Sequence, residues 1–275
     1  MGKIVKLRSL LLLIALTVGW SSNAQAAIIM VTVTFQNLAP TNSVGFAPLR
    51  VGFHNGTFDS FNNGTTATAP IISIAEGGSG SAWFPAFAAA EPNAVLGTIG
   101  GALVPTGNAG GGFASSASQT FTVDTNVNQF FTFAAMAIPS NDLFIGNDNP
   151  TAFRILDASG NLLINQINQT AGQIWDAGSE LTDPANAAFV VGGINDNRTP
   201  EGGVVRFDRS ALTAFNGLTT GAGYVFNDSG LTGTTDVGRI SFSVTAVPEP
   251  SSMALISLIG VGVVVRRFRK KHSKI

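Results

Sequence analysis

The chain has 275 residues, of which 45% are hydrophobic and 11% are charged, and it contains no cysteine. Its formal net charge is −1, but residues 27–246 hold six arginines, no lysine and 15 acidic residues, which is a formal charge of −9. The absence of cysteine excludes disulfides and thiolate metal sites, and the apolar content is too high for a disordered chain. Residues 27–246 also lack the clustered lysine and arginine that nucleic-acid binding needs. A body of roughly 200 residues can bury its own core without cross-links.

The first 26 residues have the three parts of a secretory signal peptide. Basic residues come first, at Lys3, Lys6 and Arg8, and a nine-residue apolar run follows over 10–18. That run is too short to span a bilayer as a helix. Ala24-Gln25-Ala26 is a small-x-small pattern, so we expect cleavage after Ala26, with Ala24 and Ala26 as the recognised residues.

Between residues 27 and 246 the pattern is that of short strands. Apolar and polar residues alternate over three segments, 31–36, 120–123 and 240–245. The apolar run 130–138 has the length of a buried central strand. Glycine, asparagine, aspartate and proline punctuate these runs densely. The sequence therefore predicts an all-β fold, an antiparallel sandwich or barrel, in one domain over 27–246.

Three local features add detail to this prediction. The turn 157–161 lies between two apolar triplets and predicts a hairpin. A short helix is expected near 210–215. The aromatic cluster 83–87 is interpreted as core, with contact to a sugar or a partner as the alternative.

The chain ends with an apolar segment and a basic run. Met253–Val265 carries no charge, and three arginines and two lysines follow within 266–271. A helix of this length reaches about 20 Å, which is short of the ~30 Å hydrocarbon core. Its basic flank is expected to stay cytoplasmic, as are the N-terminal charges, so the body lies outside the cytoplasmic membrane.

Pro248-Glu249-Pro250 stands directly before that apolar segment. Over residues 247–275 the ordered pattern resembles the PEP-CTERM sorting signal, in which Pro248, Glu249 and Pro250 form the motif. The resemblance implies a Gram-negative bacterium that makes extracellular polysaccharide, transient inner-membrane anchoring, and removal of the signal by an exosortase. A plain tail anchor is the alternative.

Four blocks of the body resemble the bacterial spondin-type domain, and they occur in family order: Val51–Asp59, Ile74–Gly78, Ala135–Asp142 and Ile174–Glu180. The resemblance implies a C2-like β-sandwich. Eukaryotic relatives are extracellular matrix and adhesion proteins that carry disulfides. Since this chain has no cysteine, its fold must rest on core packing alone.

The same resemblance implies a calcium site formed by Asp142, Asp176 and Glu180. Calcium prefers six to eight hard oxygen ligands, which suits carboxylates. Three carboxylates overcompensate a dication, so we expect them near solvent, in loops at strand ends. Gly178 would permit a tight turn between two ligands. The alternative is that these acids only form turns and solubilise the surface.

An enzymatic role has less support in the sequence. His54 is the only histidine of the body, which disfavours zinc and copper, and its apolar neighbours predict a structural place in a strand. A carboxylate pair drawn from Glu76, Asp176 and Glu180 remains the alternative.

We therefore expect an exported, non-enzymatic, calcium-binding protein of the bacterial cell surface or extracellular matrix. Its expected partners are the secretion machinery, an exosortase, and exopolysaccharide or other surface proteins in biofilm or adhesion. The alternatives are a carbohydrate-active enzyme of the matrix and a metal-free structural coat protein.

Overall fold

The computed structural model describes residues 28–246. The predicted signal peptide, with Ala24 and Ala26, and the predicted sorting signal, with Pro248, Glu249 and Pro250, lie outside the described residues. Within 28–246 no helix has the length and apolar character needed to cross a membrane.

Most of the regular structure is antiparallel β. The strands are β1 (Ile28–Asn37), β2 (Gly45–Phe46), β3 (Leu49–His54), β4 (Val95–Ile99), β5 (Ser116–Asp124), β6 (Phe130–Ile138), β7 (Leu143–Gly146), β8 (Gln166–Thr170), β9 (Trp175–Asp176), β10 (Arg206–Phe207) and β11 (Asp236–Ala246). The helices are α2 (Ala69–Ala75) and α3 (Trp83–Ala90), with short 3-10 turns η1 (Thr106–Asn108), η2 (Ala171–Gln173) and η3 (Ser210–Phe215).

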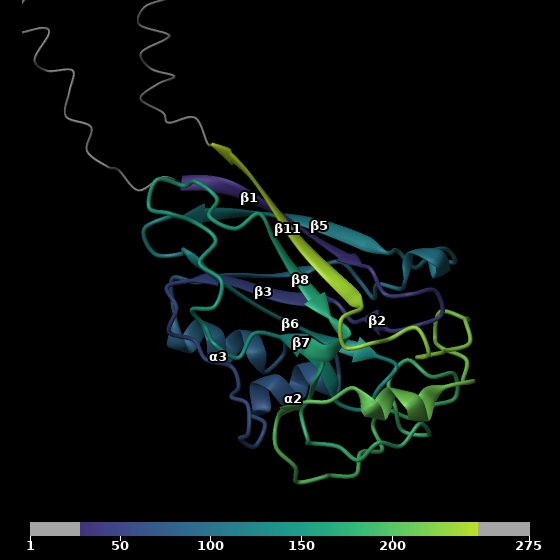
Figure 1. Cartoon of the computed structure of the whole chain (residues 1–275). Coiled ribbons are helices and arrows are strands. Elements are labelled where there is room, and N and C mark those ends of the chain that lie inside the picture. Colours follow the sequence, from purple (N-terminus) through teal and green to yellow (C-terminus); the bar gives the residue numbers. More distant parts are fainter. Residues whose placement is uncertain (1–27, 247–275) are drawn as a thin grey trace, which may run out of the picture.

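Two sheets form a sandwich, as the alternation predicted. One has the order β5-β1-β11-β8, and the other runs β10-β9-β7-β6-β3-β4, with β2 paired to β6. Figure 1 shows the first sheet lying over the second. Aromatic side chains join the two sheets: Phe53 packs on Phe121 and Phe131 packs on Phe242, with ring centroids 5.3 and 4.9 Å apart. The predicted core between two sheets is therefore present.

Strand β6 is buried on both faces, which explains its unbroken apolar run. One set of alternate residues, including Phe131 and Phe133, faces the core between the sheets. Ala134, on the other face, packs in a second cluster with residues of α2 and α3. In Figure 1 these two helices lie against the side of the larger sheet that faces away from β1 and β11.

The fold is mostly β, as predicted, and the helices α2 and α3 are an addition that the sequence did not predict. Helix α3 contains the aromatic cluster 83–87, and Trp83 and Phe87 are buried, so its interpretation as core is confirmed. The two residues are four apart and therefore share one face of a helix. Eight residues are too few for a reliable helical pattern, and this one also contains Pro85.

Of the two smaller predictions, the short helix is present and the hairpin is present only as a turn. Residues 210–215 form the 3-10 helix η3, close to the predicted short helix. The turn 157–161 reverses the chain, and one bridge joins Leu156 to Leu162, but the flanking triplets do not become strands.

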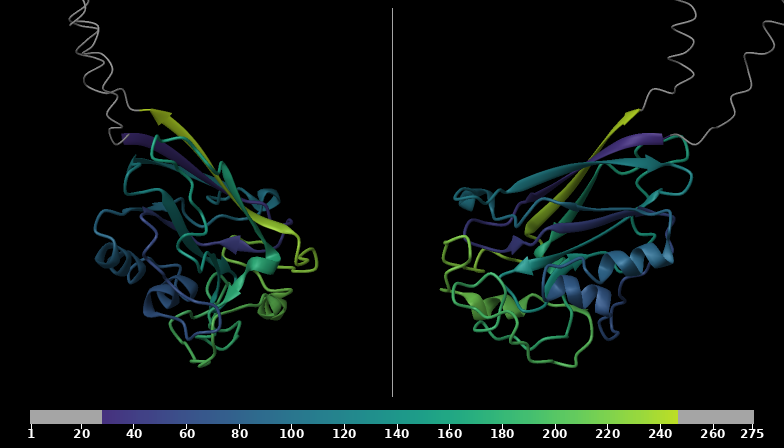
Figure 2. Two further views of the ribbon diagram at one scale, coloured as in Figure 1. Left: turned by 60° about the vertical axis from the view of Figure 1, so that its left-hand side comes forward. Right: turned by 180° about the vertical axis from the view of Figure 1, so that it is seen from behind.

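The two ends of the described chain lie side by side. Ile29 pairs with Ala246 across β1 and β11, so both termini leave from the same end of the molecule. The loops between β9 and β11 lie at the opposite end, and the views in Figure 2 agree. The candidate site described next lies among those loops and the strands that lead into them.

Candidate metal centre

Three neighbouring strands bring the site together. Asp142 directly precedes β7, Asp176 ends β9, and Arg206 begins β10. Asp176 is paired with Leu143 on one side and with Arg206 on the other. The sheet therefore places Asp142, Asp176 and Arg206 next to one another, although they are far apart in the sequence.

Three carboxylates meet at this point. Asp142, Asp176 and Glu201 each offer an oxygen, and these oxygens lie within 4.8 Å of one another. Asp142 and Asp176 are 3% and 5% exposed, whereas the Glu201 side chain is 28% exposed. This group could hold a metal ion. Two of its members are those predicted from the sequence, and the third is a different residue.

The turn after β9 holds Asp142 in place. The backbone N–H groups of Ser179 and Glu180 donate to Asp142 Oδ2 at 2.8 and 3.0 Å. Asp176 Oδ1 accepts a hydrogen bond of 2.6 Å from the N–H of Gly178. Gly178 has φ +62°, and a Cβ there would lie 2.7 Å from the backbone nitrogen of Val204. The predicted tight turn at Gly178 is confirmed.

Burial changes the acidity of both aspartates. Desolvation, joined by the nearby charge of Asp176 and opposed by the N–H donors, raises the pKa of Asp142 to about 7. Desolvation also raises the pKa of Asp176, although the Arg206 guanidinium opposes it. Both carboxylates would be stabilised in their charged form by a cation placed between them.

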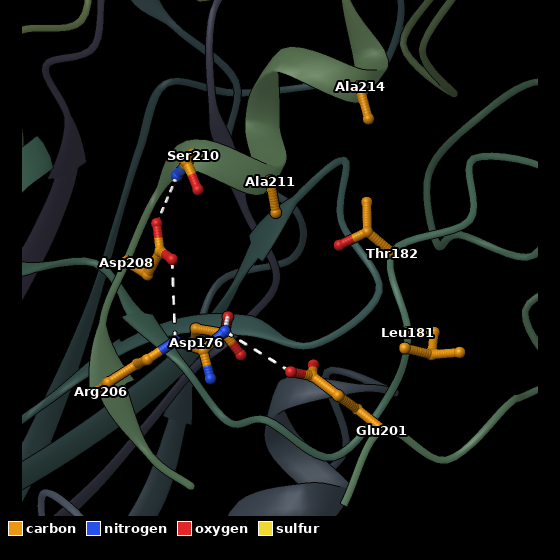
Figure 3. A pocket seen from close by; sticks show the side chains of 9 residues that line it. All are labelled: Asp176, Leu181, Thr182, Glu201, Arg206, Asp208, Ser210, Ala211 and Ala214. Carbon is orange, nitrogen blue, oxygen red and sulfur yellow. Dashed lines mark hydrogen bonds and ion pairs between the residues drawn. The ribbon is translucent and has the colours of Figure 1, made fainter. Parts of the chain in front are cut away.

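Arg206 is the cation that the described residues place here. Its Nη2 lies 2.6 Å from Asp176 Oδ2 and 3.6 Å from Glu201 Oε1, and its Nε lies 3.7 Å from Asp208 Oδ2. Figure 3 shows the guanidinium between these acids. One positive charge therefore faces four carboxylates when Asp142 is counted, and the site has an excess of negative charge.

The group opens into a pocket of about 480 Å³. Its walls come from β9, β10, the segments around 181 and 201, and η3, and they are drawn in Figure 3: Asp176, Leu181, Thr182, Glu201, Arg206, Asp208, Ser210, Ala211 and Ala214. An ion can therefore reach Asp176 and Glu201 from solvent.

Glu180 lies beside this group but its side chain turns elsewhere. Its Oε1 accepts a hydrogen bond of 2.9 Å from Asn141 Nδ2, and its Oε2 lies 3.9 Å from Arg198 Nε. The residue is 1% exposed. The expectation that the three predicted acids lie near solvent is wrong for Asp142 and Glu180, which are 3% and 1% exposed, whereas Asp176 is 5% exposed but borders the open pocket.

His54 belongs to a separate buried network. Its Nδ1 lies 3.1 Å from Glu91 Oε1 and its Nε2 lies 2.9 Å from Thr132 Oγ1. Glu91 also accepts three N–H groups of the loop 55–58. Burial lowers the pKa of His54, which favours the neutral ring. A Thr–His–Glu connection resembles a catalytic triad, but all three residues are at most 4% exposed, so their evident effect is to hold the loop to β3 and β6.

Sequence reasoning missed Glu201 and Arg206. Both lie in an irregular stretch after β9 whose only strand has two residues, and no spacing rule links them to Asp176. The acidic, lysine-free body was the one signal that pointed to cations, but it names no residue. No protein-family model matches the chain, and no curated protein matches it.

Proposed function

We propose that this protein is an exported, non-enzymatic protein of the bacterial cell surface or extracellular matrix that binds Ca²⁺ at Asp142, Asp176 and Glu201. The observation that carries the proposal is the meeting of these three carboxylates at the wall of an open pocket. The spondin-type resemblance supports it, because that resemblance implies Asp142 and Asp176 as calcium ligands.

The chemistry of the donors favours calcium over softer ions. The three side chains supply oxygen only, and the described part of the chain has one histidine, His54, which lies in its own buried network. Oxygen-only sets suit calcium, magnesium and manganese, whereas zinc and copper take nitrogen or sulfur. Magnesium requires near-ideal octahedral geometry, and irregular loops more readily satisfy the flexible coordination of calcium.

Calcium would act by joining loops that otherwise repel. Asp142 precedes β7, Asp176 ends β9, and Glu201 lies in the loop before β10. A dication between them would reduce the repulsion among the three carboxylates. It would also weaken or break the ion pair between Arg206 and Asp176. The bound ion would therefore fix the end of the sandwich opposite to the termini, where exopolysaccharide or another surface protein would be contacted.

The export route belongs to the same proposal. The signal-peptide pattern at 1–26 and the PEP-CTERM-like pattern at 247–275 support secretion, transient inner-membrane anchoring and processing by an exosortase. The spondin-type blocks support a C2-like arrangement of the sandwich. The buried Thr132–His54–Glu91 network gives no access to a substrate and therefore favours a binding role over catalysis.

Calorimetric titration of the full chain with Ca²⁺ tests the site. We expect saturable binding in the wild type and its loss in Asp176→Asn, which removes a charge but keeps the shape. Asp236→Asn, the same change at an exposed position in the other sheet, is the matched control and should bind as the wild type does. At a Ca²⁺ concentration of 100 times Kd, the native state should gain about 2.7 kcal/mol. Equal binding by wild type and Asp176→Asn would reject the site.

A further inference from the structure

A second group of acidic residues lies behind the turn that holds Asp142. Glu180 donates its N–H to Asp142, but its side chain contacts Asn141 and Arg198. Its Oε2 is buried and accepts no hydrogen bond among the described residues. An unpartnered carboxylate oxygen in a side chain that is 1% exposed is costly, so this oxygen calls for a cation or a proton.

Glu76 supplies the second carboxylate. It lies at the C-terminal end of α2 and is 7% exposed. Arg198 Nη1 donates to Glu76 Oε2 at 2.8 Å, and Asn195 Nδ2 donates to the Glu76 carbonyl oxygen at 3.1 Å. The side-chain oxygen of Asn195 is also buried without a hydrogen-bond partner in the described chain. Glu180 and Asn195 therefore each have one buried side-chain oxygen without a hydrogen bond, and each also lies beside Arg198 through a carboxylate or a main-chain oxygen.

Arg198 satisfies this group incompletely. It forms a short ion pair with Glu76, but its Nε donates to the Asn195 carbonyl oxygen at 3.1 Å and remains 3.9 Å from Glu180 Oε2. One positive charge therefore faces two buried carboxylates. The Arg198 side chain is 36% exposed, so it borders solvent.

We propose that Glu76, Glu180 and Asn195 form a second divalent-cation site, at which Arg198 competes with the ion. The donors are two carboxylates and an amide oxygen, and the main-chain carbonyl of Glu76 lies in the same group. Hard oxygen donors of this kind suit Ca²⁺ or Mn²⁺. The ion would tie α2 to the loop 181–205, which also carries Glu201 of the first site.

This site shares no carboxylate with Asp142, Asp176 and Glu201. Cation binding at the second site can therefore be tested independently of the proposed function. It also gives Glu180, the residue that sequence reasoning placed with those aspartates, a separate role. The turn 176–180 connects the two groups, since the N–H of Glu180 donates to Asp142 while the Glu180 side chain accepts from Asn141.

Calorimetric titration of the full chain with Ca²⁺ separates the two sites. Removing the competing guanidinium in Arg198→Ala should tighten one class of sites about tenfold, equivalent to about 1.4 kcal/mol. Arg154→Ala removes an exposed arginine that bonds only Gln129 among the described residues, and it should change nothing. A purely structural Arg198–Glu76 ion pair predicts instead that Arg198→Ala binds calcium no better than the wild type, and that result would overturn the proposal.

Neutralising variants provide the second arm. In the Arg198→Ala background, Glu180→Gln should abolish the tightened binding, and Asp176→Asn should leave it intact. Glu180→Gln keeps the shape of the side chain, and a thermal melt of each variant checks that it folds. If the tightened binding survives Glu180→Gln but is lost in Asp176→Asn, the ion is at the first site and the second-site proposal is rejected.

Discussion

Asp142 owes its properties to the groups around its carboxylate. Two backbone N–H groups donate to Oδ2, yet burial and the charge of Asp176 raise its pKa to about 7. An unfolded aspartate titrates near 4. Between about pH 4 and pH 7 the folded protein therefore holds a proton on Asp142 that the unfolded chain releases, and this difference makes stability depend on pH.

The sign of that dependence follows from the raised pKa. The contribution of Asp142 is fully present below the unfolded pKa and is lost as pH rises through about 7. Between pH 5.5 and 8.5 in the presence of a chelator, the wild type should lose about 2 kcal/mol relative to Asp142→Asn. Urea unfolding at the two pH values measures this difference, and the shared contribution of His54 cancels in the comparison. Parallel pH dependence in the two proteins would contradict the account.

Gly178 shows the effect of one missing side chain. In Gly178→Ala, φ +62° would be strained and the new Cβ would press on the backbone of Val204. Gly217 has φ +82° but open space around it, so Gly217→Ala adds strain alone. Strain alone costs about 1–2 kcal/mol, and Gly178→Ala should cost clearly more in free energy of unfolding. Equal losses, measured by urea denaturation, would show that the turn can move away.

At the scale of elements, the sequence predicts strands better than helices. The alternating segments form β1, β5 and β11, because a period of two is visible even in a short segment. The apolar run 130–138 forms β6, because its length and unbroken apolar character are typical of a buried strand. The helices α2 and α3 have seven and eight residues, which is too short for a clear helical period. The apolar residues on both faces of β6 were the one signal that further elements, such as helices, must cover its second face.

The same contrast applies to the site. Asp142 and Asp176 could be predicted because each lies in a motif block that ends a strand. Glu201 and Arg206 could not, because their positions depend on how the irregular loop 181–205 returns to pair with β9. A two-residue strand carries no pattern, so only the folded chain reveals this pairing.

Helix α3 supplies a prediction about packing. Phe87 is fully buried, stacks on Phe58 with ring centroids 4.0 Å apart, and contacts His54 edge-on. Phe87→Ala should cost about 3–5 kcal/mol, because it leaves a cavity between the helix and β3. Phe84, one turn away and only partly buried, is the matched control and should cost much less. Comparable losses in the two variants, measured by thermal unfolding, would mean that α3 is not docked through Phe87.

At the scale of the whole molecule, charge and topology point the same way. The basic residues at both ends belong to the proposed export signals, and the body between them carries a formal charge of −9. Both ends of the described chain lie together, and the loops between β9 and β11, which include Glu201, lie at the opposite end. A chain held to a membrane through its C-terminus would therefore present the proposed cation sites outward.

The sorting prediction belongs at this scale. In a host that contains an exosortase, the wild type should lose its C-terminal segment, and a variant with Pro248, Glu249 and Pro250 all changed to alanine should keep it. Intact-mass spectrometry of the membrane fraction distinguishes the two products. Identical processing of both proteins would favour a plain tail anchor.

The calcium site is the central claim, and a crystal structure of the chain grown with Ca²⁺ tests it most directly. The account predicts an anomalous-scattering peak bounded by Asp142, Asp176 and Glu201, with oxygens at about 2.3–2.6 Å and Arg206 displaced from Asp176. A structure at saturating Ca²⁺ with no peak at this position, and with Arg206 still paired to Asp176, would contradict it.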